Sequence, residues 1–202
     1  MVPNGIGDDY FTTSNFINIQ KKYSLDDYIL CVSRFEPRKN QTLLLRAFDE
    51  LGLREQGFKL VFIGRTDIKV SEFEDYLAAH PDLQSCVVRL KDIPFNELLS
   101  FYAQAKVAVY PSLAEGFGIP PLESAAMGTV ILCSNATAMS DFGFFDEHLF
   151  DPHDLETFKG KLMKSITHPN RSLMKDISST IRTEYHWSNI AAKFTHEVKK
   201  IF

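Results

Sequence analysis

A group of basic side chains follows the first apolar run of the sequence and has the chemistry to bind an anion. The run spans residues 28–33, and Arg34, Arg38 and Lys39 come directly after it, ahead of a helical pattern. A helix N-terminus adds partial positive charge to such a loop, so the combination favours a phosphate group. The alternative is a solvated basic turn that Glu36 partly neutralises. This loop alone leaves both interpretations open.

A second loop with glycines and prolines follows the apolar run 107–110. Gly116 and Gly118 let backbone amides approach a ligand closely, and Pro120 or Pro121 suits the first turn of a helix, where a missing N–H costs little. The segment therefore predicts a helix start that accepts an anion. It is not a dinucleotide-binding fingerprint, because Pro121 stands where that motif places its third glycine.

Two carboxylates flank this second loop. Glu115 lies on the loop and Glu123 lies about one turn into the following helix, so both side chains can face one crevice. They can share it with a bound phosphate only if cations such as Arg34 and Lys39 compensate their charge. The alternative is that Glu123 simply favours the helix dipole and that Glu115 is a solvated loop acid.

The elements that must position these loops alternate between strand and helix. The apolar, β-branched runs have the length of buried strands and lack polar alternation; they span residues 28–33, 59–63, 86–90, 107–110 and 130–134. Helical periodicity separates them, and from residue 155 onward only three helical patterns remain, over 155–167, 172–184 and 188 to the C-terminus. The pattern predicts an α/β fold with a Rossmann-like parallel sheet flanked by helices. In such sheets ligands bind outside the carboxyl ends of the strands, where both loops lie.

Composition narrows the class of protein. The chain has 202 residues, 45% of them apolar, and a formal net charge of −4, which disfavours nonspecific binding to nucleic acid. The three cysteines are widely spaced and sit in apolar sequence, as is typical of reduced core thiols. The six histidines show no paired metal spacing, so we expect them at surface or capping positions and expect no metal site. We expect a cytoplasmic protein, because no apolar run has the length of a membrane span.

Four segments in order resemble a known family. The run Glu115-Gly-Phe-Gly-Ile-Pro-Pro-Leu-Glu123 has an E-x7-E spacing and follows Ser33-Arg-Phe-Glu-Pro-Arg-Lys-Asn40. These segments, with the opening Pro3-Asn-Gly5 and the late Tyr185-His-Trp-Ser188, resemble the C-terminal, donor-binding domain of family 4 retaining glycosyltransferases, which have the GT-B fold. The resemblance extends over nearly the whole chain. It implies a nucleoside-diphosphate sugar as donor, a saccharide or lipid-linked acceptor, and no cofactor.

The resemblance also implies roles for individual residues. Arg34 and Lys39 would bind the diphosphate and offset charge on the departing nucleoside diphosphate. Glu115 would bond hydroxyls of the transferring sugar, and Glu123 would bond the ribose. The remaining contacts are implied to come from the backbone: residues Gly116, Phe117, Gly118 and Ile119 would face the sugar and phosphate, and Leu90 and Lys91 would meet the base.

The resemblance sets expectations for the organisation of the chain as well. Residues 1–202 would form one nucleotide-sugar-binding domain, with 1–24 as a junction segment and 186–202 as a terminal helix that crosses toward an N-terminal domain absent from this sequence. The full-length protein would be a hexosyltransferase, able to sit peripherally at the inner membrane, whereas this chain alone would transfer little or no sugar. The first loop departs mildly from the family, with Ser33 and Asn40 where glycines are usual.

Two other functions share the scaffold. A GT-B-like epimerase or phosphorylase is the first, because fold does not fix the reaction. A nucleotide-binding or docking module without catalysis is the second. The E-x7-E pair argues against the first, and transfer that survives loss of Glu115 would favour the second.

Overall fold

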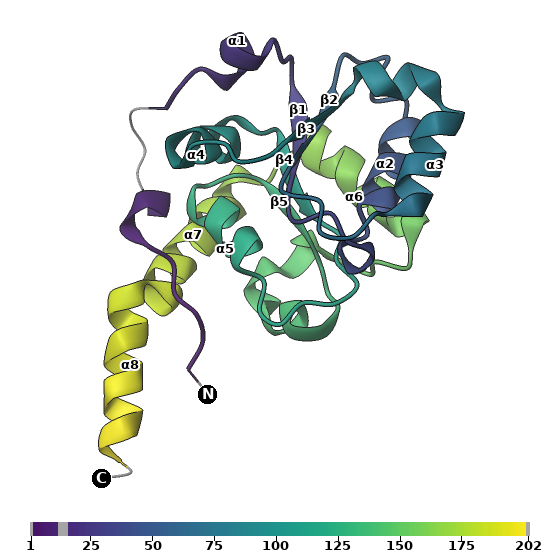
Figure 1. The fold of residues 1–202 in the computed structure, drawn as a ribbon. Helices are drawn as coiled ribbons and strands as arrows, with labels where there is room; N and C mark the ends of the chain where they lie inside the picture. Colours follow the sequence, from purple (N-terminus) through teal and green to yellow (C-terminus); the bar gives the residue numbers. More distant parts are fainter. Residues whose placement is uncertain (1, 12–15, 201–202) are drawn as a thin grey trace.

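A six-stranded parallel sheet forms the centre of the protein in a computed structural model that describes residues 2–11 and 16–200. The strands are β1 (Tyr28–Val32), β2 (Lys59–Ile63), β3 (Val87–Leu90), β4 (Val107–Tyr110), β5 (Ile131–Ser134) and β6 (Leu149–Phe150). Their order in the sheet is β3-β2-β1-β4-β5-β6, so the direction of strand progression reverses between β1 and β4 (Figure 1). The predicted Rossmann-like α/β fold is confirmed.

The central strands are buried on both faces, which explains their continuous apolar sequence. All four residues of β4 and of β5 are buried, as are the first four residues of β1. Each of the five predicted strands is present within one residue of its expected ends. The short strand β6 was not predicted, because two residues carry no periodicity to read.

Helices cover both faces of the sheet. They are α1 (Ile19–Tyr23), α2 (Gln41–Glu50), α3 (Ser71–Ala79), α4 (Phe95–Gln104), α5 (Ile119–Ala126), α6 (Leu155–Thr167), α7 (Arg171–Tyr185) and α8 (Trp187–Lys199), and short 3-10 helices η1 (Asp8–Phe11), η2 (Pro37–Lys39), η3 (Pro81–Ser85), η4 (Thr137–Asp141) and η5 (Gly143–His148) connect them. In Figure 1, α2, α3 and α6 lie on one face and α4, α5 and α7 on the other. This is the arrangement that right-handed crossovers produce around a parallel sheet.

The C-terminal helices agree with the predicted ranges to within one residue at their N-termini. The last helix, predicted from residue 188, begins at Trp187, because His186 occupies the N-cap and its side chain accepts the Ser188 amide. Asn170 caps α7 through the Leu173 amide at 3.1 Å. Helix α8 extends away from the body (Figure 1) and exposes Trp187 and Phe194. Parts of the predicted junction segment 1–24 and terminal helix 186–202, namely residues 1, 12–15, 201 and 202, lie outside the described residues.

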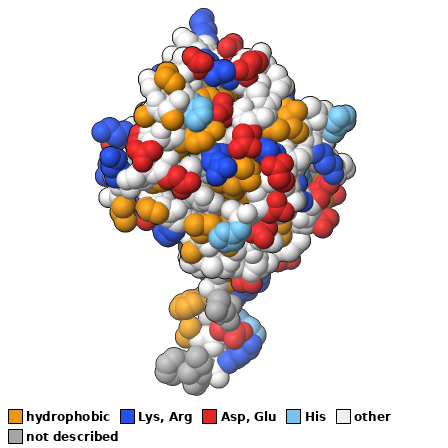
Figure 2. Space-filling model, turned by 90° about the vertical axis from the view of Figure 1, so that its right-hand side faces the viewer, with side chains coloured by type: hydrophobic (Ala, Val, Ile, Leu, Met, Phe, Trp, Pro, Cys, Tyr) orange, Lys and Arg blue, Asp and Glu red, His pale blue; other side chains and the backbone are white. Residues whose placement is uncertain are grey.

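The surface over α2, α3 and α6 carries acidic and basic side chains side by side, with no large area of one sign (Figure 2). The three cysteines are free and buried, as predicted. One histidine prediction is wrong: His148 is buried at 4% exposure, because it precedes β6 under the packed ends of α6 and α7. Among the described residues, no helix combines the length and the apolar composition that crossing a membrane requires.

Gly64 allows β1 and β2 to end side by side. A Cβ atom at Gly64 would lie 2.0 Å from the carbonyl oxygen of Ser33 and 2.7 Å from its carbonyl carbon. The φ angle of Gly64 is +154°, which L side chains rarely adopt. Because the obstacle is backbone, no rotamer change relieves it, so this position fixes where the loop after β1 begins.

We expect Gly64→Ala to lower the free energy of unfolding by about 3 kcal/mol or more, because the new methyl group must push the two backbones apart. Gly160→Ala is the matched control, since Gly160 lies inside α6 with open space around its Cβ position. There the same substitution is expected to stabilise by about 0.5–1 kcal/mol. Urea unfolding of both variants checks the contrast, and equal effects would contradict the assigned role of Gly64.

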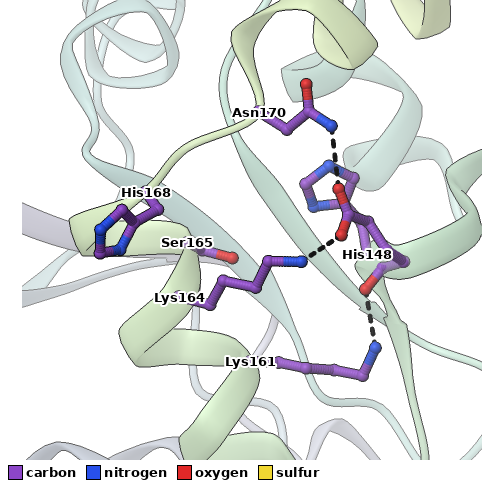
Figure 3. Close-up of a pocket in the computed structure, with 7 residues that line it drawn as sticks. His148, Lys161, Lys164, Ser165, His168 and Asn170 are labelled. Carbon is purple, nitrogen blue, oxygen red and sulfur yellow. Dashed lines mark hydrogen bonds and ion pairs between the residues drawn. The ribbon is translucent and has the colours of Figure 1, made fainter.

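Glu147 joins η5, α6 and α7 at a small cavity of about 60 Å³ (Figure 3). Its carboxylate accepts hydrogen bonds from Lys164 and from Asn170, the latter at 3.0 Å, and its backbone oxygen accepts one from Lys161 at 2.7 Å. The bond from Lys164, followed by that from Asn170, lowers the pKa of Glu147 to about 2. The residue precedes β6, so this cluster lies at the amino edge of the sheet, opposite the loops expected to bind ligand.

The stabilisation from Glu147 is expected to disappear in acid. An unfolded glutamate titrates near its ordinary pKa of 4.5, so below that pH the unfolded chain binds the proton while the folded one does not until about pH 2. The contribution is therefore complete above about pH 4.5 and falls as the pH drops toward 2. Glu147→Gln should be less stable than the parent at neutral pH and converge on it in acid. A difference in unfolding midpoint that stays constant over this range would rule this out.

Candidate active site at the carboxyl ends of β1 and β4

The two loops singled out in the sequence leave neighbouring strands at the reversal point of the sheet. The loop after β1 and the loop after β4 diverge there, because the chain continues in opposite directions across the sheet. The main chain joins them directly: the Leu113 amide donates a 2.7 Å hydrogen bond to the carbonyl oxygen of Arg38. In open α/β sheets this crevice is where ligands bind.

Lys39 and Glu115 form the central contact between these loops. The Lys39 ammonium lies 2.5 Å from Glu115 Oε1, and the Ser112 hydroxyl donates to the same oxygen at 2.8 Å. Lys39 is only 9% exposed, and Glu115 is largely covered. The sequence predicted both residues for the site, and the structure brings them together.

Arg38 contacts the carboxylate of Glu115 from the side that faces solvent. Its guanidinium donates to Glu115 Oε2 and to the carbonyl oxygen of Ala114, each at 3.0 Å, and to Glu36 at 2.7 Å. Glu36 thus neutralises part of the basic loop, as one of the two interpretations of the sequence expected. Glu115 accepts from two cations and one hydroxyl, which leaves a lone pair on Oε2 available to a further donor.

The ionic state of Glu115 follows from these partners. Burial opposes its ionisation, but the hydrogen bonds from Lys39 and Ser112 outweigh burial, so the pKa of Glu115 is lowered. The carboxylate is therefore ionised at neutral pH and can accept hydrogen bonds only. A hydroxyl-rich ligand suits it, whereas an unaccompanied phosphate does not.

Thr137, which lies in the loop after β5, bonds the backbone of Glu115. The Thr137 hydroxyl accepts the Glu115 amide at 2.8 Å and lies 3.2 Å from the Glu115 carbonyl oxygen, to which it donates. Thr137 has a φ angle of +51°, an uncommon conformation for a β-branched residue. Backbone strain of this kind persists where surrounding contacts require it, and it concentrates at functional sites.

The segment from Gly116 to Ile119, here called the elbow, supplies backbone amides. Gly118 has a φ angle of +97°, and a Cβ there would lie 3.0 Å from both Met139 and Phe142. The amides of Gly116, Phe117 and Gly118 donate no hydrogen bond within the described part of the chain. Helix α5 starts at Ile119 with prolines in its first turn, as predicted, so the elbow amides are its main free donors toward an anion.

The Arg34 side chain does not contact the Lys39–Glu115 pair and instead bonds a residue of another loop. Its side chain is 71% exposed and bonds Asp67 in the loop after β2 at 2.8 Å. Exposed ion pairs of this kind contribute about 0–1 kcal/mol, so the guanidinium is readily released to a stronger anion. The backbone of Arg34 is nevertheless fixed, because the side-chain amide of Gln41 donates to the carbonyl oxygen of Arg34 at 2.7 Å and to the Ser33 hydroxyl at 3.0 Å.

Glu123 is half-buried on the α4 side of α5, where its carboxylate faces a tyrosine. The Tyr102 hydroxyl donates to Glu123 Oε2 at 2.9 Å, and Tyr10 of η1 lies near enough to this carboxylate to affect its pKa. Burial raises the pKa of Glu123 even though both tyrosines lower it. The two carboxylates of the E-x7-E pair therefore have separate partners: Glu115 accepts from two cations and a serine hydroxyl, and Glu123 accepts from the Tyr102 phenol.

Leu90 and Lys91, expected near a base, lie where β3 ends. The carbonyl oxygen of Leu90 already accepts the Gly64 amide at 2.9 Å, and Lys91 is exposed. Three further contributors escaped the sequence reasoning: Ser112, Thr137 and Asp67. Ser112 could have been predicted, because its hydroxyl lies three residues before Glu115. Thr137 and Asp67 could not, because they lie on the loops after β5 and β2, far from Glu115 and Arg34 in the sequence.

Loss of the Tyr102 hydroxyl is expected to act through the charge of Glu123. In Tyr102→Phe the carboxylate loses a donor, so its pKa rises further and the free energy of unfolding falls by about 1–2 kcal/mol at neutral pH. A protonated carboxyl is uncharged and loses less when that donor is removed. The destabilisation by Tyr102→Phe should therefore be smaller at pH values below the raised pKa of Glu123.

The matched control is Tyr28→Phe, whose buried hydroxyl donates to the uncharged carbonyl oxygen of Phe101 at 2.7 Å. Its cost should not vary with pH. Unfolding measured at several pH values, with carboxyl resonances followed by NMR, separates the two variants. A pH-independent loss in Tyr102→Phe would contradict the coupling.

Comparisons with known proteins agree with this arrangement. A model of the family "Glycosyl transferases group 1" matches residues 13–183. The serotype-specific mannosyltransferase WbdA of Escherichia coli is 26% identical over 200 residues, which cover 94% of this chain and 24% of that protein. This chain therefore spans about a quarter of that relative.

Solved structures share the fold. A sucrose-phosphate synthase from Thermosynechococcus elongatus superposes with a TM-score of 0.82 at 22% identity, over 100% of this chain and 52% of that one. HepE of Anabaena in complex with UDP-glucose does so with a TM-score of 0.78 at 14% identity, over 97% of this chain and 56% of that one. With a family match over most of its length, the chain belongs to the group 1 glycosyl transferases and forms the C-terminal domain of their GT-B fold.

Proposed function

We propose that this chain is the donor-binding half of a retaining glycosyltransferase, which moves a hexose from a nucleoside-diphosphate sugar to a saccharide or lipid-linked acceptor. The observation that carries the proposal is the contact between Lys39 and Glu115 at the reversal point of the sheet, beside the free amides of the elbow. It puts a shielded cation, an ionised carboxylate and anion-binding amides within one crevice. Family membership supplies the class of reaction.

The cations would serve the leaving group. Departure of a nucleoside diphosphate concentrates negative charge on its terminal phosphate, and a fixed ammonium plus oriented amides lower the barrier to that change. Lys39 is held in place by Glu115, so it needs little reorganisation when the phosphate arrives. Arg34 would leave Asp67 and close over the diphosphate from the rim, at the small cost of an exposed ion pair.

The carboxylates would hold the neutral parts of the donor. Glu115 keeps an acceptor site on Oε2 for a hydroxyl of the transferring sugar, with its backbone fixed by Thr137. Glu123 would accept the ribose hydroxyls, and Tyr102 fixes its orientation. HepE, a structural neighbour, is solved with UDP-glucose, which supports a nucleotide sugar as the class of donor here.

The acceptor and an N-terminal domain complete the proposed enzyme. The exposed Trp187 and Phe194 of α8 offer an apolar face toward such a domain. Since one half of the catalytic cleft would come from it, we propose that the 202-residue chain binds a nucleoside diphosphate but transfers little or no sugar by itself.

We expect GDP or UDP to stabilise the chain against thermal unfolding, by about 2.7 kcal/mol at a concentration one hundred times the Kd. Arg34→Ala should reduce the stabilisation, and Lys39→Ala with Arg34→Ala should abolish it, because both cations toward the diphosphate are then lost. Lys175→Ala is the control, since Lys175 is exposed on α7. A nucleotide shift that survives the double variant, or that Lys175→Ala removes as well, would refute the proposed site.

A further inference from the structure

A groove with three basic side chains lies between η1, the C-terminal end of α5 and α7, on the face of the sheet that α4, α5 and α7 cover (Figure 1). Its volume is about 390 Å³, and its lining shares no residue with the elbow or with the Lys39–Glu115 pair. The basic side chains are Arg171, Lys175 and Arg182 of α7. We propose that this groove, here called the basic groove, docks the protein on a membrane surface that carries anionic lipids. The proposal rests on the proposed function, in which the acceptor can be lipid-linked.

The three cations share one strip of α7. Steps of four and of seven residues separate them, and on a helix both steps return to nearly the same face. All three side chains are exposed. The acidic residues of this helix, Asp176 and Glu184, lie about 100° or more around the helix axis from each of the three cations. The strip is therefore positive along its whole length.

No acidic side chain balances this strip. Among the described residues, the lining of the groove contains no aspartate or glutamate, and none of the three cations forms an ion pair. On α6, by contrast, Lys159 bonds Glu50 at 2.8 Å. Arg182 donates to the carbonyl oxygen of Phe11 at 3.2 Å, which carries no charge. Since the chain as a whole has a formal net charge of −4, the groove is a local positive surface that attracts anions.

The spacing of the cations decides which kind of anion fits. Arg171 and Arg182 are separated by about 16 Å along the helix axis. One phosphate or diphosphate group cannot reach both ends of such a strip. A membrane with anionic lipids presents many phosphate groups in one plane, and mobile lipids need no fixed register with the protein. The strip therefore suits a membrane surface better than a single phosphorylated small molecule.

The floor of the groove is apolar and fixed in place. Met174 is buried and Met127 is half-buried, and both line the groove. The Ser178 hydroxyl donates to the carbonyl oxygen of Ala126 at 2.7 Å, which ties α7 to the end of α5. Long basic side chains above an apolar floor suit the boundary between lipid headgroups and acyl chains.

The aromatic ring in the groove does not favour nucleic acid, the other partner that presents rows of phosphates. The guanidinium of Arg182 lies over the Phe11 ring, 4.4 Å from its centroid. That contact occupies a ring face on which a base would stack, and stacking on aromatic side chains is a main source of affinity for single strands. The observations thus favour the membrane.

Helix α7 connects the basic groove to the donor crevice. The ring of Tyr185, at the end of α7, has its centroid 6.3 Å from that of Phe117 in the elbow. With α7 along a membrane, the crevice would therefore lie close to the membrane plane, where a lipid-linked acceptor presents its sugar. The basic groove itself contacts lipid headgroups and leaves the acceptor to the N-terminal domain of the proposed enzyme.

The test is cosedimentation of the 202-residue chain with vesicles of phosphatidylcholine alone, or of phosphatidylcholine and phosphatidylglycerol in a two-to-one ratio. We expect binding only to the anionic vesicles, and weaker binding as added salt screens the charges. Arg171→Gln with Lys175→Gln should lower the affinity about 25-fold, because each basic residue near such a surface contributes about fivefold. Arg171→Lys should bind as the parent does, since a membrane surface recognises the charge of arginine and not its planar geometry.

The matched control is Lys21→Gln with Lys69→Gln, which removes the same charge from two exposed positions outside the groove. It should lower the affinity by about twofold or less, because salt screens distant charges. An equal loss in both double variants would assign the effect to net charge, and equal binding to both kinds of vesicle would assign it to apolar contacts. Each of these results overturns the proposal, as does a failure to bind the anionic vesicles, unchanged binding in Arg171→Gln with Lys175→Gln, or a loss of binding in Arg171→Lys. A single-stranded RNA that binds the groove more tightly than the vesicles do, and displaces the protein from them, overturns it in favour of nucleic acid.

The same samples are tested for thermal stabilisation by GDP and UDP, which each of these variants should leave unchanged. Vesicle binding without stabilisation by nucleotide would uphold the basic groove and refute the donor function. Stabilisation by nucleotide without vesicle binding would refute the basic groove alone.

Discussion

The ion pair between Lys39 and Glu115 is the interaction on which the geometry of the site depends. It joins loops that are 76 residues apart in the chain and that leave the sheet in opposite directions. Both charges are largely removed from solvent, so deleting either one would leave the other buried without its partner. The pair therefore fixes the position of the loop after β1 relative to the loop after β4.

The surroundings of the pair set its charge balance. Arg38 and Glu36 add one charge of each sign at the rim, so the immediate cluster of two cations and two carboxylates is neutral before a ligand binds. A diphosphate then needs additional positive charge, and the elbow amides and Arg34 are the groups in position to supply it. The ion pairs of the site are thus balanced in charge without a ligand, and the hydrogen-bond donors for a diphosphate lie at the edge of the crevice.

The fold could be predicted from the sequence because its signals are local. Buried parallel strands are continuous apolar runs, and helical periodicity alone located residues 155–167, which form α6 with Asp154 at its N-cap. The strand β6 and the His186 cap were not predicted, because a two-residue strand has no period and histidine is an unusual N-cap. Long-range packing decides both.

The candidate site divides in the same way. Residue type next to a strand end was enough to predict Lys39, Glu115, Gly118 and the prolines of α5. Lys39 and Glu115 are in contact in the structure. The strained Thr137, the close approach at Gly64 and the hydrogen bond from Tyr102 to Glu123 depend on contacts between segments that lie far apart in the sequence. No spacing within one segment encodes them. The roles of all the predicted site residues toward a ligand, including Lys39, Glu115 and Glu123, stay predictions.

The most direct measurement is a crystal structure of the chain with GDP or UDP bound. The account predicts the terminal phosphate within hydrogen-bonding distance of Lys39 Nζ and of the elbow amides, with Arg34 moved from Asp67 toward the diphosphate and the ribose beside Glu123. A nucleotide seated at the Glu147 cavity, along α8, or in the crevice without contact to Lys39 would contradict it.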